Sequence, residues 1–272
     1  MFLAHKSQIS NNGYKPIEQL DNRYVLTAQG LVSNVCPHQK SLISTVSGTG
    51  NRICPYHQWS FSLKGEPLGS GRTLHYCRNE NFLETKQTYE WNNLLFSKAV
   101  NFDIPVSFDG MTIMEERIDI VNASVENIMD LFLDVDHIPA VHKGVYDRIN
   151  LPNINEVQWR YYEHGSVQTV PTLNALGAIW IAVYPNTMIE WQPGALFVTV
   201  ATPISTFESK VFVFKYQDIN YPESTYALNE DVWETAWEQD KTQASLITEF
   251  NYSNLEESKE HFRNWLSANR SN

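Results

Sequence analysis

The sequence is poor in basic residues and cysteine, and it lacks a long hydrophobic segment. Lysine and arginine number 20 against 31 aspartates and glutamates, which gives a formal net charge of -11. A chain this acidic, with no basic run, repels a phosphate backbone, so we expect no nucleic-acid partner. The longest uncharged apolar run, residues 175–184, covers ten residues, whereas a transmembrane helix needs about 20. The sequence therefore predicts no membrane span.

The scarcity of cysteine also bears on the cellular compartment. Three cysteines are too few for a disulfide scaffold and favour a reducing cytoplasm. The N-terminal residues 1–6 turn polar at once, a pattern that predicts no secretory signal. The chain has 272 residues, of which 42% are hydrophobic and 19% charged. This composition is typical of a globular cytoplasmic protein with one large or two ordinary domains.

Two of the cysteines are each followed closely by a histidine. The chain reads Cys36-Pro-His38 and, after fifteen intervening residues, Cys54-Pro-Tyr-His57. Two thiolates and two imidazoles form a four-ligand set for a soft metal, and zinc is one candidate. Zinc fingers, however, usually pair cysteine with cysteine and histidine with histidine, whereas each motif here supplies one of each. The mixed pairing favours a two-iron cluster in which the cysteines bind one iron and the histidines bind the other.

This pair of motifs resembles the cluster-binding motifs of the Rieske family. A proline follows each cysteine, and residues 58–61 (Gln-Trp-Ser-Phe) are similar to the strand that follows the second histidine in the family's H-G-W-x-F pattern. There are two departures. Residues 39–40 read Gln-Lys where most members have Arg-Gly, and Gln58 replaces a glycine. The resemblance implies a Rieske 2Fe–2S cluster bound by Cys36, His38, Cys54 and His57.

The chain around these motifs consists of short apolar runs separated by turn residues. This pattern predicts a small antiparallel β domain over residues 14–100. We expect the third cysteine, Cys77, to be a small buried side chain without a disulfide partner, since the other two are assigned to iron. His75 is expected to be an ordinary turn or surface residue.

A second domain is predicted over residues 101–272. Ser124 is expected to cap a helix, because apolar residues recur on one face at positions 128, 131, 132 and 135. Pro139 ends this periodicity. Strand-like runs at 178–184, 196–201 and 210–216 are followed by a long helical pattern over 228–247 and a last amphipathic helix over 253–269. Together these elements predict an α+β domain, with the last helix packing onto it rather than anchoring the protein to a membrane.

The end of the first predicted helix carries Asp134, His137 and His142 in the pattern D-x-x-H-x-x-x-x-H. On a continuous helix the two histidines diverge by about 140°, so they converge only if the chain bends at Pro139. Two histidines and one carboxylate form the set with which iron(II) activates O₂. Two unrelated surface histidines are the alternative interpretation. With a Rieske motif upstream, the pattern resembles the iron motif of Rieske non-haem iron oxygenases.

The third ligand is predicted in the long C-terminal helix. Asp240 falls in phase with the apolar residues of that helix at positions 233, 236, 237, 244 and 247. A lone buried carboxylate is costly, so a metal or a Lys or Arg partner must offset its charge. The preceding Glu238-Gln239 is similar to the family segment that supplies the third ligand. We therefore predict Asp240 as the ligand, with Glu234 and Glu238 as the candidates if the helix is phased differently.

The resemblance covers about residues 20–250 and implies a terminal oxygenase of the alpha-subunit type with a helix-grip (START-like) catalytic domain. An external reductase or ferredoxin would supply electrons to the cluster. A mononuclear Fe(II) would then use O₂ to hydroxylate or demethylate a small organic substrate. The family also implies a homotrimer in which Asp134 bridges the two metal sites of neighbouring subunits, with Asp130 as the fallback. The alternative is a Rieske electron-transfer protein fused to a ligand-binding helix-grip domain without catalytic iron. In that case His137, His142 and Asp240 would not converge.

Overall fold

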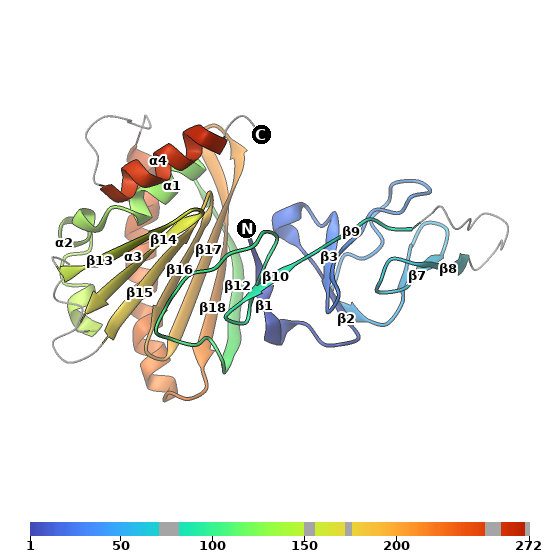
Figure 1. Cartoon of the computed structure of the whole chain (residues 1–272), viewed down its shortest axis with the longest axis horizontal. Helices are drawn as coiled ribbons and strands as arrows, with labels where there is room; N and C mark the ends of the chain where they lie inside the picture. The colour runs from blue at the N-terminus through green and yellow to red at the C-terminus, as the bar shows by residue number, and fades with distance from the viewer. Residues whose placement is uncertain (71–81, 150–155, 172–175, 248–256, 270–272) are drawn as a thin grey trace. The chain divides into compact units, whose positions relative to one another are not determined.

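A computed structural model describes residues 1–70, 82–149, 156–171, 176–247 and 257–269. The chain divides into two compact units, Phe2–Ala99 and Val100–Asn272, the latter including Met1 (Figure 1). The predictions for His75 and Cys77, and for residues 253–256 of the last helix, lie outside the described residues.

The first unit is built from short strands, and every strand pair described in it is antiparallel, as expected. Its elements are β1 (Phe2–His5), η1 (Lys6–Gln8), β2 (Gly13–Pro16), η2 (Glu18–Leu20), β3 (Tyr24–Thr27), β4 (Gly30–Ser33), β5 (Gly48–Thr49), β6 (Arg52–Ile53), β7 (Trp59–Phe61), β8 (Pro67–Ser70), β9 (Thr85–Lys86), β10 (Tyr89–Trp91) and β11 (Leu94–Phe96). The strands form three sheets with the orders β1-β11-β10, β5-β2-β3-β4-β9 and β6-β7-β8. Strand β1 adds residues ahead of the predicted start at residue 14.

The core of the first unit includes the two motif cysteines. Cys36 and Cys54 are buried together with Trp59 and Phe61, which alternate with the partly exposed Ser60 along β7. Successive side chains of a strand point to opposite faces. Because Trp59 and Phe61 are both buried, the face of β7 that carries them points into the core. The motif loops are therefore anchored in the core at their cysteine ends.

The second unit pairs one antiparallel sheet with helices. Its elements are β12 (Met111–Val121), α1 (Val125–Phe132), η3 (Val135–His137), α2 (Ile138–Val141), η4 (Tyr146–Ile149), β13 (Gln158–Tyr162), β14 (Gly165–Pro171), β15 (Leu176–Val183), β16 (Thr187–Gln192), β17 (Ala195–Ser205), β18 (Glu208–Asp218), α3 (Glu223–Leu246) and α4 (Glu257–Asn269). The sheet has seven strands in the order β12-β18-β17-β16-β15-β14-β13. The long helix α3 lies along one face of this sheet (Figure 1). The predicted mixture of helix and sheet is confirmed.

Two helix boundaries differ from those predicted. Ser124 caps α1 as expected, because its Oγ accepts the Asn127 N–H at 3.1 Å. The helix ends at Phe132, however, so Val135 lies in the separate 3₁₀ turn η3. Helix α3 begins at Glu223, five residues before the predicted start, because Pro222 occupies the N-cap position.

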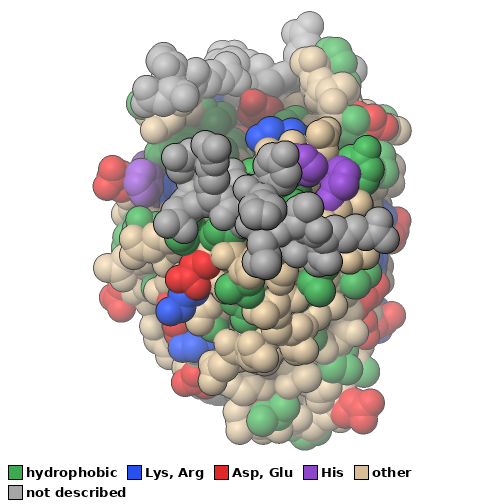
Figure 2. Space-filling view, turned by 90° about the vertical axis from the view of Figure 1, so that its right-hand side faces the viewer, with side chains coloured by type: hydrophobic (Ala, Val, Ile, Leu, Met, Phe, Trp, Pro, Cys, Tyr) green, Lys and Arg blue, Asp and Glu red, His purple; other side chains and the backbone are tan. Residues whose placement is uncertain are grey.

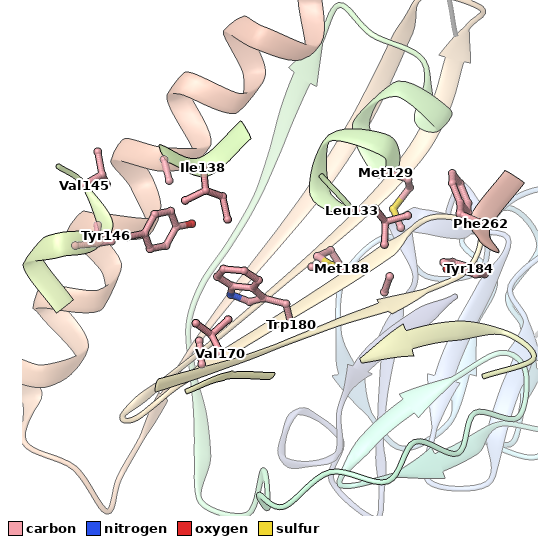
Figure 3. Packing of buried hydrophobic residues seen from close by; sticks show 14 of the residues in the cluster. Met129, Leu133, Ile138, Val145, Tyr146, Val170, Trp180, Tyr184, Met188 and Phe262 are labelled. Carbon is pink, nitrogen blue, oxygen red and sulfur yellow. The ribbon is translucent and has the colours of Figure 1, made fainter. Parts of the chain in front are cut away.

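The core of the second unit lies between the sheet and its helices. Met188 and Tyr184 from the sheet lie on the side of Met129 and Leu133 from the α1 region, whereas Trp180 faces Tyr146 (Figure 3). Helix α4 contributes Phe262, which is fully buried in the same cluster. The helix thus packs as predicted. Among the helices in the described part of the chain, none is long and apolar enough to span a membrane.

Candidate metal centres

The two motif loops of the first unit have the same backbone geometry. The Cys36 N–H donates to the Ser41 carbonyl at 2.8 Å, and the Lys40 N–H donates to the Cys36 carbonyl at 2.9 Å. In the second loop, the Cys54 N–H donates to the Trp59 carbonyl at 2.7 Å, and the Gln58 N–H donates to the Cys54 carbonyl at 2.9 Å. Each loop is therefore closed around its cysteine by an equivalent pair of hydrogen bonds.

The residue four places after each cysteine adopts a left-handed conformation. Lys40 has φ 58° and Gln58 has φ 60°, a region that favours glycine. Both departures from the family pattern therefore leave the loop conformation in place. The side chains that replace glycine cost about 1 kcal/mol each in local strain.

The four side chains of these loops divide by burial. Cys36 and Cys54 are buried, and burial raises the pKa of the Cys36 thiol, with Cys54 in hydrogen-bonding contact beside it. His38 and His57 are exposed, with ring centroids 4.6 Å apart. Histidine side chains are visible at the surface in the view of Figure 2. The His38 ring also stacks on Trp59 at 5.1 Å. Two buried sulfurs below two exposed imidazoles fit a cluster with one sulfur-ligated and one histidine-ligated iron.

In the second unit, His137, His142 and Asp240 converge. The two histidine Nε2 atoms lie 3.0 Å apart. Asp240 Oδ1 lies 3.3 Å from Nε2 of His137 and 2.9 Å from Nε2 of His142. Ligands bound at about 2.1 Å and at right angles to one another lie about 3.0 Å apart. The three atoms therefore fit one face of the coordination shell of a single metal ion.

The chain bends between the two histidines as the sequence predicts. His137 ends the 3₁₀ turn η3, and the single-turn helix α2 follows with Pro139 in its first turn. His142 stands at the C-cap of α2 with φ -103° and ψ 33°. This change of helix type replaces the continuous helix on which the two imidazoles would diverge.

Hydrogen bonds to Nδ1 orient both imidazoles. Nδ1 of His137 bonds the main-chain carbonyl of Asp134, and Nδ1 of His142 lies 2.8 Å from Gln239 Oε1. With a metal bound and each Nδ1–H donating, each Nε2 would present its lone pair to the metal rather than a proton to Asp240. Gln239 was not predicted from the sequence in this role. The sequence signal that could have identified Gln239 is its position next to Asp240 on α3.

Asp240 is 6% exposed. Burial acts to raise the pKa of its carboxyl, but the hydrogen bonds from His137 and His142 outweigh burial and hold that pKa below its usual range. Within the described residues, no Lys or Arg forms an ion pair with Asp240. Its charge is offset by the two imidazoles alone, which is the arrangement that a bound cation would complete.

The carboxylate of Asp134 is placed differently from expectation. It accepts the backbone N–H of His137 at 3.2 Å and pairs with Lys259 Nζ at 2.6 Å. The contact to the His137 ring comes from its main-chain carbonyl instead. Asp130, the fallback residue, accepts two hydrogen bonds from Arg263, at 2.9 and 3.0 Å. Helix α4 therefore holds both acidic residues through its own basic side chains.

The three converging residues line a pocket with about 400 Å³ of empty volume, part of which is open to solvent. Aromatic and apolar side chains dominate its wall, which consists of Phe132, His137, Ile138, His142, Tyr146, Trp180, Met188, Glu190, Trp233, Ala236, Trp237 and Asp240. Figure 3 labels four of these residues, Ile138, Tyr146, Trp180 and Met188, among the buried side chains between the sheet and the helices. The arrangement suits a small organic molecule held next to a metal.

Glu190 is the pocket residue that sequence reasoning missed. It is 7% exposed, and burial raises the pKa of its carboxyl to about 7. The Trp233 indole N–H donates to its Oε1 at 3.0 Å. A glutamate between Ile189 and Trp191 in an otherwise uncharged strand was the signal that could have identified it.

A second acidic cluster in this unit is closed by a lysine. The carboxylates of Glu115, Glu230 and Glu234 converge. The Nζ of Lys215 pairs with all three, at 2.5 Å from Glu115, at 2.8 Å from Glu230, and in close contact with Glu234. The lysine already offsets these charges, so this cluster is an ion-pair network rather than a metal centre.

Comparison with known proteins places these sites in context. Residues 1–73 match the family described as the Rieske [2Fe-2S] domain. The chain is 25% identical over 232 residues to a putrescine 2-hydroxylase of Ralstonia nicotianae, an alignment that covers 71% of this chain and 60% of that protein. It is 24% identical over 309 residues to a putrescine 2-hydroxylase of Bordetella bronchiseptica, with 86% and 69% covered. The chain thus spans about three-fifths of the first relative's length.

Solved structures share the fold at lower identity. The quaternary ammonium Rieske monooxygenase CntA in complex with an inhibitor superposes with a TM-score of 0.76 and 14% identity, covering 98% of this chain and 87% of that one. Naphthalene 1,2-dioxygenase from Rhodococcus sp. gives a TM-score of 0.62 and 16% identity, covering 100% of this chain and 76% of that one. These comparisons confirm the resemblance predicted from the two motifs.

Proposed function

We propose that this chain, which carries a Rieske [2Fe-2S] domain and has the fold of Rieske oxygenases, is a terminal oxygenase that hydroxylates or demethylates a small organic substrate. The observation that carries the proposal is the meeting of His137 Nε2, His142 Nε2 and Asp240 Oδ1 within 3.3 Å of one another on a pocket wall. A Rieske electron carrier without catalytic iron has no need of such a set. The convergence therefore favours the oxygenase.

In this proposal Cys36, His38, Cys54 and His57 hold the 2Fe–2S cluster. The buried cysteines would keep one side of the cluster in the core, and the exposed histidines would bring the other side to the surface. An external reductase or ferredoxin could then pass single electrons to the exposed side. The equivalent hydrogen bonds of the two loops would hold the ligands in place without rearrangement.

His137, His142 and Asp240 would hold a mononuclear iron(II), which supplies the O₂-activating chemistry when bound. For a hydroxylation, one oxygen atom enters a C–H bond and the other leaves as water, and two electrons and two protons are consumed. The reductase supplies the electrons. The chain's own residues orient the site: Gln239 and the Asp134 carbonyl fix the imidazoles, and the aromatic wall of the pocket limits access of water.

The finer features of the fold and assembly extend the same proposal. A long helix lying along one face of an antiparallel sheet supports a helix-grip domain for the second unit. One solved structure of CntA is described as revealing inter-subunit electron transfer in that enzyme. By analogy we assign inter-subunit electron transfer to this chain. It would occur in the homotrimer that the sequence resemblance implies and in the cytoplasm that the low cysteine content favours, and Asp134 would lie between the iron of one subunit and the cluster of its neighbour.

Metal and spectroscopic analysis of the protein tests the proposal. An oxygenase should contain three irons per chain, two in the cluster and one alone, with the visible absorption and reduced-state EPR of a Rieske centre. With a surrogate reductase it should incorporate label from ¹⁸O₂ into a product. Two irons per chain would favour the electron carrier instead. A colourless protein with full zinc occupancy would rule out the cluster as well.

A further inference from the structure

We infer that Glu190 binds a positively charged nitrogen of the substrate, so that the oxygenated compound is a small aliphatic ammonium compound. The inference rests on the proposed oxygenase function, because it names the substrate class of the same pocket. Its basis is the position of Glu190 on β16, on the pocket wall that also carries the three converging residues.

Glu190 is a buried carboxylate with no cation beside it. Its one hydrogen-bond donor is the neutral indole N–H of Trp233, at 3.0 Å from Oε1. Across the described parts of the chain, no Lys, Arg or His forms an ion pair with it, and the Trp233 indole is the only hydrogen-bond donor described for its carboxylate. A buried carboxylate is costly unless a cation or several donors satisfy it. A ligand with an ammonium group would supply what the protein does not.

The same sheet also contains a buried charge that is fully paired. Glu190 pairs in register with Phe197, which pairs in turn with Lys215 on β18. Lys215 is 2% exposed and is surrounded by three carboxylates. Phe197 stacks on Trp233 at 5.1 Å, so an aromatic pair lies between the satisfied lysine and the unsatisfied glutamate. Glu190 thus lacks the ion pairing that Lys215 has in the same sheet.

The rest of the pocket wall suits a cation of this kind. Tyr146 and Trp180 line the pocket with Glu190, and their ring centroids lie 6.2 Å apart in an edge-to-face arrangement. Aromatic faces attract ammonium and quaternary ammonium groups, and the attraction grows when water is excluded. Trp180 also pairs in register with Glu190 across β15 and β16. The carboxylate and an aromatic face therefore lie side by side on one surface of the sheet.

A rival role for Glu190 is to balance the charge of the metal. Asp240 already supplies one negative charge to the set formed with His137 and His142, and Glu190 does not belong to the residues that converge there. A charge-balancing residue would affect iron retention, whereas an ammonium-binding residue would affect the choice between charged and neutral ligands. The two roles therefore differ in a measurable way.

Calorimetric titration of the iron-loaded protein distinguishes them. The probes are n-butylammonium, n-butyltrimethylammonium and n-butanol, which share an alkyl chain and differ in charge and in N–H donors. We expect the wild-type protein to bind at least one of the two cations at least tenfold more tightly than butanol. Glu190→Gln, which keeps the side-chain shape and an acceptor for Trp233, should weaken binding of that cation by about 10- to 100-fold. Butanol binding and the iron content should not change.

Glu238→Gln is the matched control, because Glu238 is an exposed glutamate on α3 that pairs with Lys241 outside the pocket. It should bind all three probes as the wild type does. The inference is overturned if butanol binds the wild type as tightly as both cations do, or if Glu190→Gln retains the preference for a cation. Loss of iron from Glu190→Gln would likewise overturn it in favour of charge balance.

The titrations need no turnover, so their failure can be told apart from failure of the proposed function. A preference for cations that depends on Glu190, in a protein with two irons per chain, supports the binding site and contradicts the oxygenase. Three irons and ¹⁸O₂-labelled product from neutral compounds alone would support the oxygenase and contradict the ammonium site.

Discussion

The candidate cluster site and the candidate iron site differ in how far apart their ligands lie along the chain. Cys36, His38, Cys54 and His57 come from two neighbouring loops, each closed by its own pair of backbone hydrogen bonds. The iron site instead joins residues 137 and 142, after α1, to residue 240 on α3. The first site is therefore set by local chain geometry, and the second by packing of a helix against a distant turn.

Solvent exposure divides the two sites in the same way. His38 and His57 are exposed, whereas the side chains of His142 and Asp240 are 1% and 9% exposed. A surface imidazole can receive electrons from another protein. A metal held by the buried residues would lie beside a largely apolar pocket wall, which limits its contact with water. The contrast implies that substitutions at the two sites should separate electron transfer from oxygenation.

The largest effect is expected from Asp240→Ala. Removing the carboxylate should empty the mononuclear site while the Rieske absorption is retained, because no described contact of Asp240 involves the first unit. Iron should fall from three to about two per chain, and oxygenation should stop. Metal analysis and product assays measure both. Glu238→Ala, on an exposed face of the same helix, is the control and should retain all three irons. If Asp240→Ala keeps the third iron, Asp240 is not an iron ligand.

The next effect concerns communication between the sites. Asp134→Asn keeps the side-chain size and loses its charge, so both metals should remain while turnover falls by about 10- to 100-fold, the usual effect of altering an outer-shell partner. Lys259→Met tests whether the ion pair itself matters, since it removes the partner of Asp134 and keeps the carboxylate. Single-turnover rates in the two variants separate these effects. A wild-type rate in Asp134→Asn would mean that Asp134 does not couple the sites.

Acid should weaken metal binding at the candidate iron site. Burial acts to lower the pKa of His142, but its hydrogen bond to Asp240 and the charge of Asp240 outweigh burial, and the pKa is raised above the usual value. Iron must displace the proton that this pKa describes. Affinity should therefore be level above the raised pKa and fall by about tenfold per pH unit below it. Chelator competition across the pH range measures this fall. A flat profile would contradict it.

The smallest effect tests the local geometry of the cluster loops. Gln58→Gly removes a side chain from a residue with φ 60° and should stabilise the first unit by about 1 kcal/mol. Gln58→Ala keeps a Cβ at the same φ and should give no such gain. Denaturant unfolding of the intact protein, followed by cluster absorbance, measures both variants. Equal stability of the two variants would show that this backbone conformation costs little.

The candidate metal ligands could be predicted because they occur in short sequence patterns. The two Cys-Pro-(x)-His motifs suggested a Rieske cluster without knowledge of the fold. Asp240 was identified because it interrupts an apolar helical stripe, and the position of Pro139 suggested the bend that brings the two histidines together. These inferences depend on spacing along a single element, which periodicity reveals directly.

Other features depended on contacts between elements far apart in sequence. Asp134 pairs with Lys259 through helix α4, and Gln239 orients His142 from α3. Neither contact could be predicted from residue spacing, since each contact joins elements separated by about a hundred residues. Glu190 is the clearest case, because an acidic residue in a strand faces either water or the core according to the register of the sheet.

Sequence patterns alone indicated which residues could bind metal, and they predicted a β domain with a cysteine–histidine cluster motif followed by an α+β domain with a histidine pair. Ligand chemistry and local periodicity are properties of short segments, so they can be recognised without knowledge of the fold. Which carboxylates face the pocket and which are neutralised by a cation depends on the packing of distant elements. That outcome depends on burial and on the distance to opposite charges, and packing of α3 against the sheet left Glu190 without a cation while it enclosed Lys215 among three acids.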